Sequence, residues 1–255
     1  MGTYFDDIHS MPENELGGLP HGLADSPEVI ALRGMDNYAG LMALGKARCR
    51  QLRYREAIEV YTRAIACNPA EPEAYRQRAA RYLATLQPEL AVEDFKRSLP
   101  YSFDKADTLY RMGIALYLAG HWEEAMEAQE KAYPCFDEEM GIAAMFWHTM
   151  SAFRSGREPV LLREFREGME VGHHTAYELA MQLASGRISL EQTRQELQKI
   201  DADLEYAMAA YGSAVCAERM GETEIAAQLL DSVVRRDSFW ICYGYLAAWN
   251  DRYNR

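Results

Sequence analysis

The sequence predicts an all-α protein whose helices form a solenoid of hairpins, and three observations support this prediction. The 255-residue chain is 49% hydrophobic and contains only 17 glycines and 9 prolines, a composition typical of many helices and few strands. Small residues recur every 34 residues through the first half of the chain. The first of these units closes at Asn68-Pro69, where a helix should end because proline disfavours the helical conformation in the residue before it.

Three ladders of small residues share this period. They are Gly45, Ala79 and Gly113; Ala57, Ala91 and Ala125; and Ala64, Ser98 and Ala132. Two antiparallel helices that cross at short distance need Gly or Ala where their backbones meet. We therefore expect a large residue at Ala57 or Ala125 to overpack the crossing, at a cost of about 1 to 3 kcal/mol.

The first unit also matches a known repeat. The stretch LMALGKARCRQLRYREAIEVYTRAIACNPA, residues 41–70, resembles the tetratricopeptide-repeat (TPR) pattern W-x2-L-G-x2-Y … A-x3-F … P. The resemblance implies a right-handed superhelical solenoid of TPR helix hairpins, with a degenerate central unit and a C-terminal capping helix. It also implies that the first helix of each hairpin lines a concave groove that holds partner proteins.

The repeats divide the chain into four segments. We expect an acidic, flexible N-terminal tail at 1–37, three TPR units at 38–139, a degenerate TPR plus an inserted helix pair at 140–206, and a final TPR unit with a capping helix at 207–255. The tail carries seven acidic residues and one basic residue. It is therefore a candidate for self-inhibition, because it could occupy a basic groove of its own chain.

The central segment departs from the repeat pattern. We expect Gly156 at the turn of the degenerate unit, Phe165 on its second helix and Gly168 at a small-residue position. The inserted pair should be a helix, a short glycine-containing turn and an amphipathic helix capped by Ser189. The segment FWICYGYLAAW, residues 239–249, reads as a closing helix, since end helices cover the exposed core of a solenoid.

The order of these pieces resembles the NlpI-type TPR lipoproteins of bacterial envelopes. The likeness covers about residues 106–249 and is sharpest at GIALYLAG, at Ser185-Gly186-Arg187-Ile188-Ser189 and at the Met220-Gly221 turn. It implies an adaptor that presents proteases or hydrolases with their substrates, and a homodimer. Because the chain shows no signal peptide or lipobox cysteine, we carry over only the adaptor architecture.

The charge of the chain is uneven, which suggests where a partner binds. The formal net charge is −12, yet residues 41–111 hold 13 Lys/Arg against 9 Asp/Glu, a local excess of +4. Arginine forms forked contacts with carboxylates and tyrosine adds rigid contact area. We therefore predict a groove for an acidic or C-terminal peptide, lined by first-helix residues Lys46, Arg50, Arg76, Tyr110, Arg111 and Tyr117.

A second resemblance is to TPR co-chaperones that grip the C-terminal carboxylate of heat-shock proteins. The positions of that clamp correspond here to Met42, Lys46, Gln77, Asp107 and Arg111. Only Arg111 matches the residue type that the clamp uses. We therefore expect no clamp of this kind, although Lys46 and Arg76 could grip a different acidic peptide.

Several classes of protein and several compartments are disfavoured. The acidic net charge argues against a nucleic-acid binder, because neutralising phosphates requires a basic surface. No apolar run approaches the length of a membrane span, and the N-terminus has no apolar signal segment. Five cysteines form an odd set without a CxxC pair, which suggests reduced thiols. We therefore expect a cytoplasmic protein.

Neither an enzyme site nor a metal or cofactor site is expected. No phosphate-binding loop, GxSxG motif or Cys/His arrangement at known spacing occurs. The His173-His174 pair, with His148 upstream, is set aside because adjacent helical histidines point about 100° apart. The acidic runs at 123–124 and 137–139 read as solvated charge.

The leading hypothesis for function is thus a non-catalytic adaptor that binds a peptide of a partner protein in the groove of the first three repeats, and a homodimer is part of this hypothesis. Two alternatives stay open. One is a regulatory receptor that senses a peptide and changes its curvature, and the other is an accessory subunit of an enzyme such as a protease. The partner itself cannot be read from the sequence, because a fold of this kind serves many functions.

Overall fold

The computed structural model describes residues 25–254, and its regular structure there is entirely helical. This range contains thirteen α-helices and three short 3-10 helices and no strand. The predicted all-α hairpin architecture is therefore confirmed. The chain forms two compact units, unit 1 (Met1–Thr108) and unit 2 (Leu109–Arg255).

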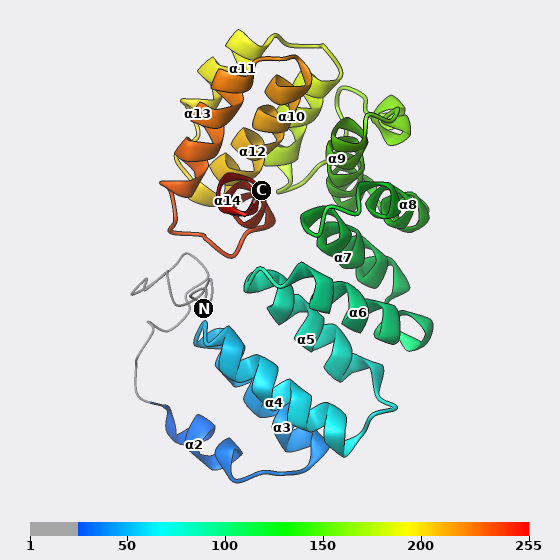
Figure 1. The fold of residues 1–255 in the computed structure, drawn as a ribbon, viewed down its shortest axis with the longest axis vertical. Helices are drawn as coiled ribbons and strands as arrows, with labels where there is room; N and C mark the ends of the chain where they lie inside the picture. The colour runs from blue at the N-terminus through cyan, green and yellow to red at the C-terminus, as the bar shows by residue number, and fades with distance from the viewer. Residues whose placement is uncertain (1–24, 255) are drawn as a thin grey trace. The chain divides into compact units, whose positions relative to one another are not determined.

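Unit 1 contains one short helix followed by two helical hairpins (Figure 1). Its helices are α2 (Pro27–Arg33), α3 (Tyr38–Arg50), α4 (Tyr54–Cys67), α5 (Pro72–Ala84), α6 (Pro88–Ser98) and the 3-10 helix η1 (Leu99–Tyr101). Helix α3 pairs with α4 and α5 pairs with α6, while α4 packs on α5 and so joins the two hairpins. As expected from Asn68-Pro69, α4 ends at Cys67, and Pro88 occupies the first turn of α6, where a missing N–H costs nothing.

The small-residue ladders lie where the two helices of a hairpin cross. A Cβ added to Gly45 would lie 2.4 Å from Cε1 of Tyr61, and one added to Gly113 would lie 2.4 Å from Nε2 of Gln129. The alanines and the serine of the three ladders are completely buried, namely Ala57, Ala64, Ala79, Ala91, Ser98, Ala125 and Ala132. The period that the sequence shows is therefore the period of close helix contact.

The turn inside each hairpin repeats as well. Leu52, Leu86 and Gly120 are 34 residues apart, and their φ angles of 59°, 50° and 84° are all left-handed. A leucine in this conformation is strained, because its Cβ approaches the following carbonyl oxygen. Gly221 takes the same conformation, with φ of 85°, in the last hairpin.

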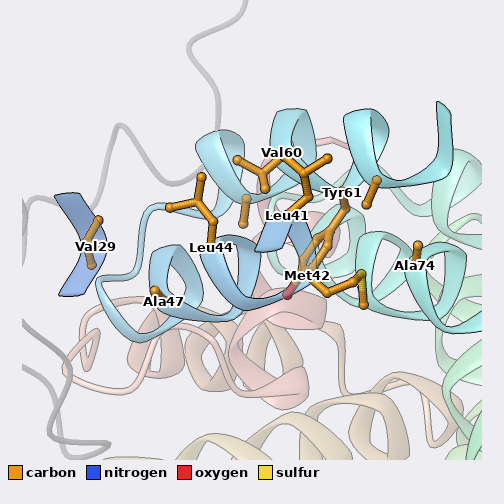
Figure 2. Close-up of a cluster of buried hydrophobic side chains, with 10 residues drawn as sticks. Val29, Leu41, Met42, Leu44, Ala47, Val60, Tyr61 and Ala74 are labelled. Atoms are coloured by element: carbon orange, nitrogen blue, oxygen red, sulfur yellow. The ribbon is translucent and has the colours of Figure 1, made fainter. Parts of the chain in front are cut away.

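The apolar core of unit 1 lies between α3 and α4. Figure 2 shows Leu41, Leu44, Val60 and Tyr61 converging from the two helices, and all four are buried. Val29 of α2 belongs to the same cluster. Helix α2 is thus attached to the hairpin through an apolar contact.

This attachment corrects the prediction of a flexible tail for residues 25–37, the part of 1–37 that the structure describes. Residues 27–33 form α2, because Ser26 caps its start by accepting a hydrogen bond from the N–H of Val29 (3.3 Å) and because Val29 is buried. Asn37 then caps α3 by accepting from the N–H of Gly40 (2.9 Å). Residues 1–24 lie outside the described part of the chain. The hypothesis that the tail occupies a groove of its own chain concerns these residues and stays a prediction.

Unit 2 continues the hairpin pattern and then departs from it (Figure 1). Its helices are α7 (Lys105–Leu118), which begins just before the boundary, α8 (Trp122–Ala132), η2 (Tyr133–Cys135), α9 (Glu138–Ser155), η3 (Val160–Glu164), α10 (Thr175–Ala184), α11 (Leu190–Leu197), α12 (Asp203–Arg219), α13 (Thr223–Val234) and α14 (Tyr243–Tyr253). Helix α12 packs on α9, α10, α13 and α14 and is the centre of the unit.

The degenerate unit differs from its prediction. Its turn at Gly156 is left-handed as expected, with φ of 69°, but no second α-helix follows. Phe165 lies in extended backbone after η3, and Gly168 has a positive φ of 76° in a turn. The segment cannot continue as a helix, because Gly172 also has a positive φ and Glu138 accepts a hydrogen bond from the N–H of Glu170 (2.6 Å).

The later elements match their predictions more closely. Ser189 caps α11 in a capping box with Gln192, and Gly186 forms the turn before it. The closing helix exists, although α14 begins only at Tyr243, four residues into the segment expected to be helical. The His173-His174 pair lies in the turn before α10 rather than on a helix.

Candidate functional site: first-helix residues of the two units

Unit 1 contributes three of the six residues predicted to line the groove. Lys46 on α3 is exposed, as the prediction requires. Arg50, the last residue of α3, has a side chain that is 63% exposed and lies 3.6 Å from Glu28. An exposed ion pair at this distance contributes little, because water screens it.

Arg76 on α5 is already engaged by carboxylates of its own chain. Its Nε and Nη2 donate to the two carboxylate oxygens of Glu73 at 2.9 and 3.0 Å, and its Nη1 donates to Asp107 at 3.0 Å. The Arg76 side chain is 26% exposed. The surface predicted to be basic is thus one of mixed charge, in which a forked arginine already holds two carboxylates.

Glu73 links the cations of α3 and α5. Burial works to raise the pKa of Glu73, but hydrogen bonds from Arg76 and Gln77 and the charges of Arg76 and Lys46 outweigh it and hold that pKa below its usual value. Lys46 and Arg76 therefore act on the same carboxylate. The charges of both cations thus favour the ionised form of Glu73.

A second arginine of α5 has a structural role instead. Arg78 donates to Asp94 on α6 at 2.6 and 2.8 Å, and the side chain of Asp94 is buried. This fork joins the two helices of the hairpin. Arg78 is therefore no part of the candidate surface, although it lies only two residues from Arg76.

In unit 2, the two tyrosines predicted to line the groove are core residues. Tyr117 is completely buried and its hydroxyl lies 2.5 Å from that of Tyr211, while its ring meets the edge of Trp147 at 5.2 Å. Tyr110 is also buried, and burial raises its pKa well above the usual value. Neither tyrosine can contact a bound peptide, so this part of the prediction is wrong.

Residues of α9, α10 and α12 cover these tyrosines, and α14 also folds back onto α7 and α9. Arg111 of α7 donates to the hydroxyl of Tyr243 at 3.0 Å, and Asn250 donates to the carbonyl oxygen of Leu118 at 3.0 Å. Arg154 of α9 donates to Asp251 at 2.7 Å. The chain's own last helix thus contacts α7 at Arg111, one of the residues that a partner was expected to contact.

Small residues in the closing segment could have indicated that α14 packs closely on the rest of unit 2. The closing segment has small residues at Gly244, Ala247 and Ala248, and the two alanines are completely buried. A Cβ on Gly244 would lie 2.7 Å from the carbonyl oxygen of Ala207 on α12. Small residues on a terminal helix therefore indicated a helix packed closely on all sides rather than a simple cap.

Across the described residues, none of the helices combines the length and the apolar character that crossing a membrane requires.

Sequence comparisons find relatives over about a third of the chain. No family model matches. The chain is 34% identical over 90 residues to the TPR repeat-containing thioredoxin TDX of Arabidopsis thaliana, covering 35% of this chain and 24% of that protein. It is 33% identical over 91 residues to the heat-shock protein cognate (HSC) co-chaperone sgt12 of Aspergillus fumigatus, covering 36% and 27%. The chain thus matches only about a quarter of the length of these relatives.

Structural comparison extends the likeness to most of the chain. A tetratricopeptide repeat protein from Parabacteroides merdae superposes with a TM-score of 0.56 and 16% identity, covering 84% of each chain. At this identity the likeness concerns the fold alone.

Proposed function

We propose that this chain, which resembles tetratricopeptide-repeat proteins in sequence over about a third of its length and in its fold, works as a non-catalytic adaptor that binds an acidic peptide segment of a partner protein. The proposed site is the surface of α3 and α5 in unit 1, with Lys46 and Arg76 as its cations. The observation that carries the proposal is the Arg76 fork, which already holds two carboxylates in the geometry that a partner's Asp, Glu or C-terminus would need.

The partner's carboxylate would replace one that the chain supplies. Contacts between partly exposed ions contribute only about 0 to 1 kcal/mol each, so Glu73 or Asp107 can release Arg76 at small cost. The exchange conserves the number of charged hydrogen bonds of Arg76. It also leaves Lys46 to attract a second acidic group of the same peptide.

The relationship to a co-chaperone supports an adaptor but argues for a different mode of binding. The Aspergillus fumigatus relative is an HSC co-chaperone. Among the clamp positions considered above, Met42 is buried in this chain and Arg111 is bonded to Tyr243. The proposal therefore depends on Lys46 and Arg76 and not on the carboxylate clamp of the co-chaperones.

Two further observations fit a non-catalytic protein of the cytoplasm. In the two acidic runs, Glu123 accepts from Arg157 at 2.7 Å and Glu138 forms an ion pair with Arg166. Burial raises the pKa of Cys216 and Cys242 to about 12, so both stay protonated thiols at neutral pH. Protonated, buried thiols are poor nucleophiles.

The proposal is tested by reversing the charge of the two cations. We would immobilise the full chain and the double variant Lys46→Glu/Arg76→Glu, capture partners from native extract, identify them by mass spectrometry and measure their affinity with purified protein. The expected result is a partner that binds the wild type and whose affinity falls at least about tenfold in the variant, because two attractive contacts become repulsive.

The matched control is Lys96→Glu/Arg97→Glu on α6, which makes the same change of charge at two exposed residues of a second helix. This variant should keep the partner. Loss in both variants would mean that overall charge and not this surface decides binding. Retention in both, with circular dichroism showing folded protein, would exclude α3 and α5 as the site.

A further inference from the structure

Three potential metal ligands meet in unit 2, whereas the proposed peptide surface belongs to unit 1. Glu139 in the first turn of α9 and the adjacent His173 and His174 each offer one ligand atom, and these atoms lie within 4.8 Å of one another. Nδ1 of His173 is 2.6 Å from Oε1 of Glu139. His148, the third histidine considered from the sequence, does not belong to this cluster, since it is buried and its Nε2 lies 3.0 Å from Glu130.

His173 and His174 can share one metal ion because they do not lie on a helix. On a helix, neighbouring side chains point about 100° apart. They lie instead in the turn that leads into α10, and His174 is the residue before the helix. Their ring centroids are 4.9 Å apart, so the turn brings both imidazoles to the same side.

The carboxylate of Glu139 is held in position by the backbone of this turn. The N–H of His173 donates to Oε1 of Glu139 at 3.3 Å. Gly172 makes this approach possible, because a Cβ at that residue would lie 2.5 Å from the carboxylate carbon of Glu139. Its φ of 53° is also one that glycine adopts without strain.

The hydrogen bond of His174 fixes a tautomer that leaves one ring nitrogen for a metal ion. Its Nδ1 lies 2.8 Å from the backbone carbonyl oxygen of Glu139, which can only accept, so Nδ1 carries the proton and Nε2 carries the lone pair. The ring also meets the edge of the Tyr177 ring at 5.3 Å. A ligand histidine commonly donates its other ring N–H to a carbonyl oxygen, which fixes its tautomer and its direction.

We propose that Glu139, His173 and His174 bind a divalent transition-metal ion, with Zn²⁺ as the first candidate. Two imidazole nitrogens and one carboxylate oxygen are a donor set that suits zinc and its neighbours in the first transition row rather than Mg²⁺ or Ca²⁺, which prefer oxygen. His173, whose side chain is 86% exposed, has its Nδ1 2.6 Å from Oε1 of Glu139 and supplies the second imidazole nitrogen. Water completes a tetrahedral site.

The ion would join two segments that are 34 residues apart in the chain. It would tie the first turn of α9 to the residue before α10, across the irregular stretch that replaces the second helix of the degenerate unit. Because the unfolded chain does not assemble these ligands, a bound ion stabilises the folded unit. We therefore expect a structural metal site, which stabilises the folded unit.

The test is zinc binding by the full chain, freed of any histidine tag and treated with a chelator. Isothermal titration with ZnCl₂ should give one saturable site, and Co²⁺ should show the absorption of a tetrahedral complex. In His173→Ala and in Glu139→Gln the affinity should fall about tenfold or more. Zinc should raise the midpoint of thermal unfolding in the wild type and in neither variant.

His121→Ala is the control, since His121 is an exposed histidine of the same unit outside the cluster, and it should bind as the wild type does. His173→Ala is the decisive variant, because its exposed side chain can be removed without disturbing the core. Absence of saturable binding to the wild type, or an unchanged affinity in His173→Ala, would overturn the proposal and leave Glu139 as a hydrogen-bond acceptor for the turn.

Discussion

At the scale of single residues, a carboxylate attaches α2 to the first hairpin. Asp25 accepts hydrogen bonds from Nη1 and Nη2 of the buried Arg48, the latter at 3.1 Å, and from Gln51 at 3.2 Å. Hydrogen bonds from Arg48 do most to lower the pKa of Asp25 to about 2, and they outweigh the opposing effect of burial. Asp25 is therefore ionised at every physiological pH.

Acid should release α2 from the hairpin. The pKa of Asp25 is about 2 when folded against an ordinary 3.8, so its contribution to stability is complete above the ordinary value and is lost as the pH falls from there through about 2. We expect the hydrogen-exchange protection of Pro27–Arg33 to decrease over this range. Asp25→Asn should already lack that protection at neutral pH. Equal protection in the variant and the wild type would mean that Val29 alone holds the helix.

A second carboxylate, Asp251 of α14, neutralises the largely buried Arg154. Nη2 of Arg154 lies 2.7 Å from Asp251, and Tyr211 donates to the same oxygen at 3.0 Å. The Asp251 side chain is 4% exposed, whereas Glu218, the other acidic partner of Arg154, is 49% exposed. The two partners of one arginine thus differ mainly in burial.

This difference predicts unequal effects of two similar substitutions. Asp251→Asn should lower the free energy of unfolding by about 3 kcal/mol or more, because it removes the buried one of the two charge partners of a largely buried guanidinium. Glu218→Gln should lower it by about 1 kcal/mol or less, because water already screens that pair. Urea unfolding followed by tryptophan fluorescence would measure both. Equal losses would show that burial does not set the strength of these pairs.

At the scale of elements, the hairpins depend on short distances between helices. Ala57→Leu should destabilise the α3–α4 crossing by about 1 to 3 kcal/mol, because Ala57 is completely buried and added methyl groups overpack the core. Ala39→Leu is the control, since Ala39 is exposed on α3, and its effect should stay within about 0.5 kcal/mol. Thermal unfolding of both variants checks this, and a tolerated Ala57→Leu would mean that the hairpin can widen.

The left-handed turn at Gly120 predicts how substitutions there change stability. Gly120 has a positive φ and nothing lies within 4 Å of an added Cβ, so a substitution there tests conformation alone. Gly120→Ala should cost about 1 kcal/mol, whereas Gly120→Asn should cost less, because asparagine adopts the left-handed conformation more readily. Chemical denaturation would compare the two. If alanine were as stable as glycine, the turn would have changed its conformation.

At the scale of the whole molecule, α14 determines which surface of unit 2 is open. Ending the chain at Cys242 removes the partners of Arg111, Arg154 and the Leu118 carbonyl oxygen. We expect α7, α9 and α12 to lose hydrogen-exchange protection and unit 2 to bind a hydrophobic dye, while α3 and α4 keep their protection. Unchanged exchange in α7 and α9 would mean that α14 covers these helices without stabilising them.

Much of this fold follows from the sequence, because its determinants are local. The 34-residue ladders mark residues that touch within one hairpin, such as Gly45 and Tyr61, so their spacing is visible in the chain itself. The helix ends at Asn68-Pro69 and Ser189 depend on neighbours within a few residues. For the same reason, the exposure of Lys46 could be predicted from its place on α3.

The tertiary structure alone decided what depends on distant residues. Tyr110 and Tyr117 have the spacing of groove residues, but they are buried because the unit closes over α7. Arg76 has Glu73 three residues before it in the sequence, but only the fold brings Asp107 to it, 31 residues along the chain. Glu139 and the His173-His174 turn meet only because no second helix forms between them. The spacing of residues in the sequence indicates which of them share a face of a helix. Only tertiary packing determines whether that face is buried, and by which other residues.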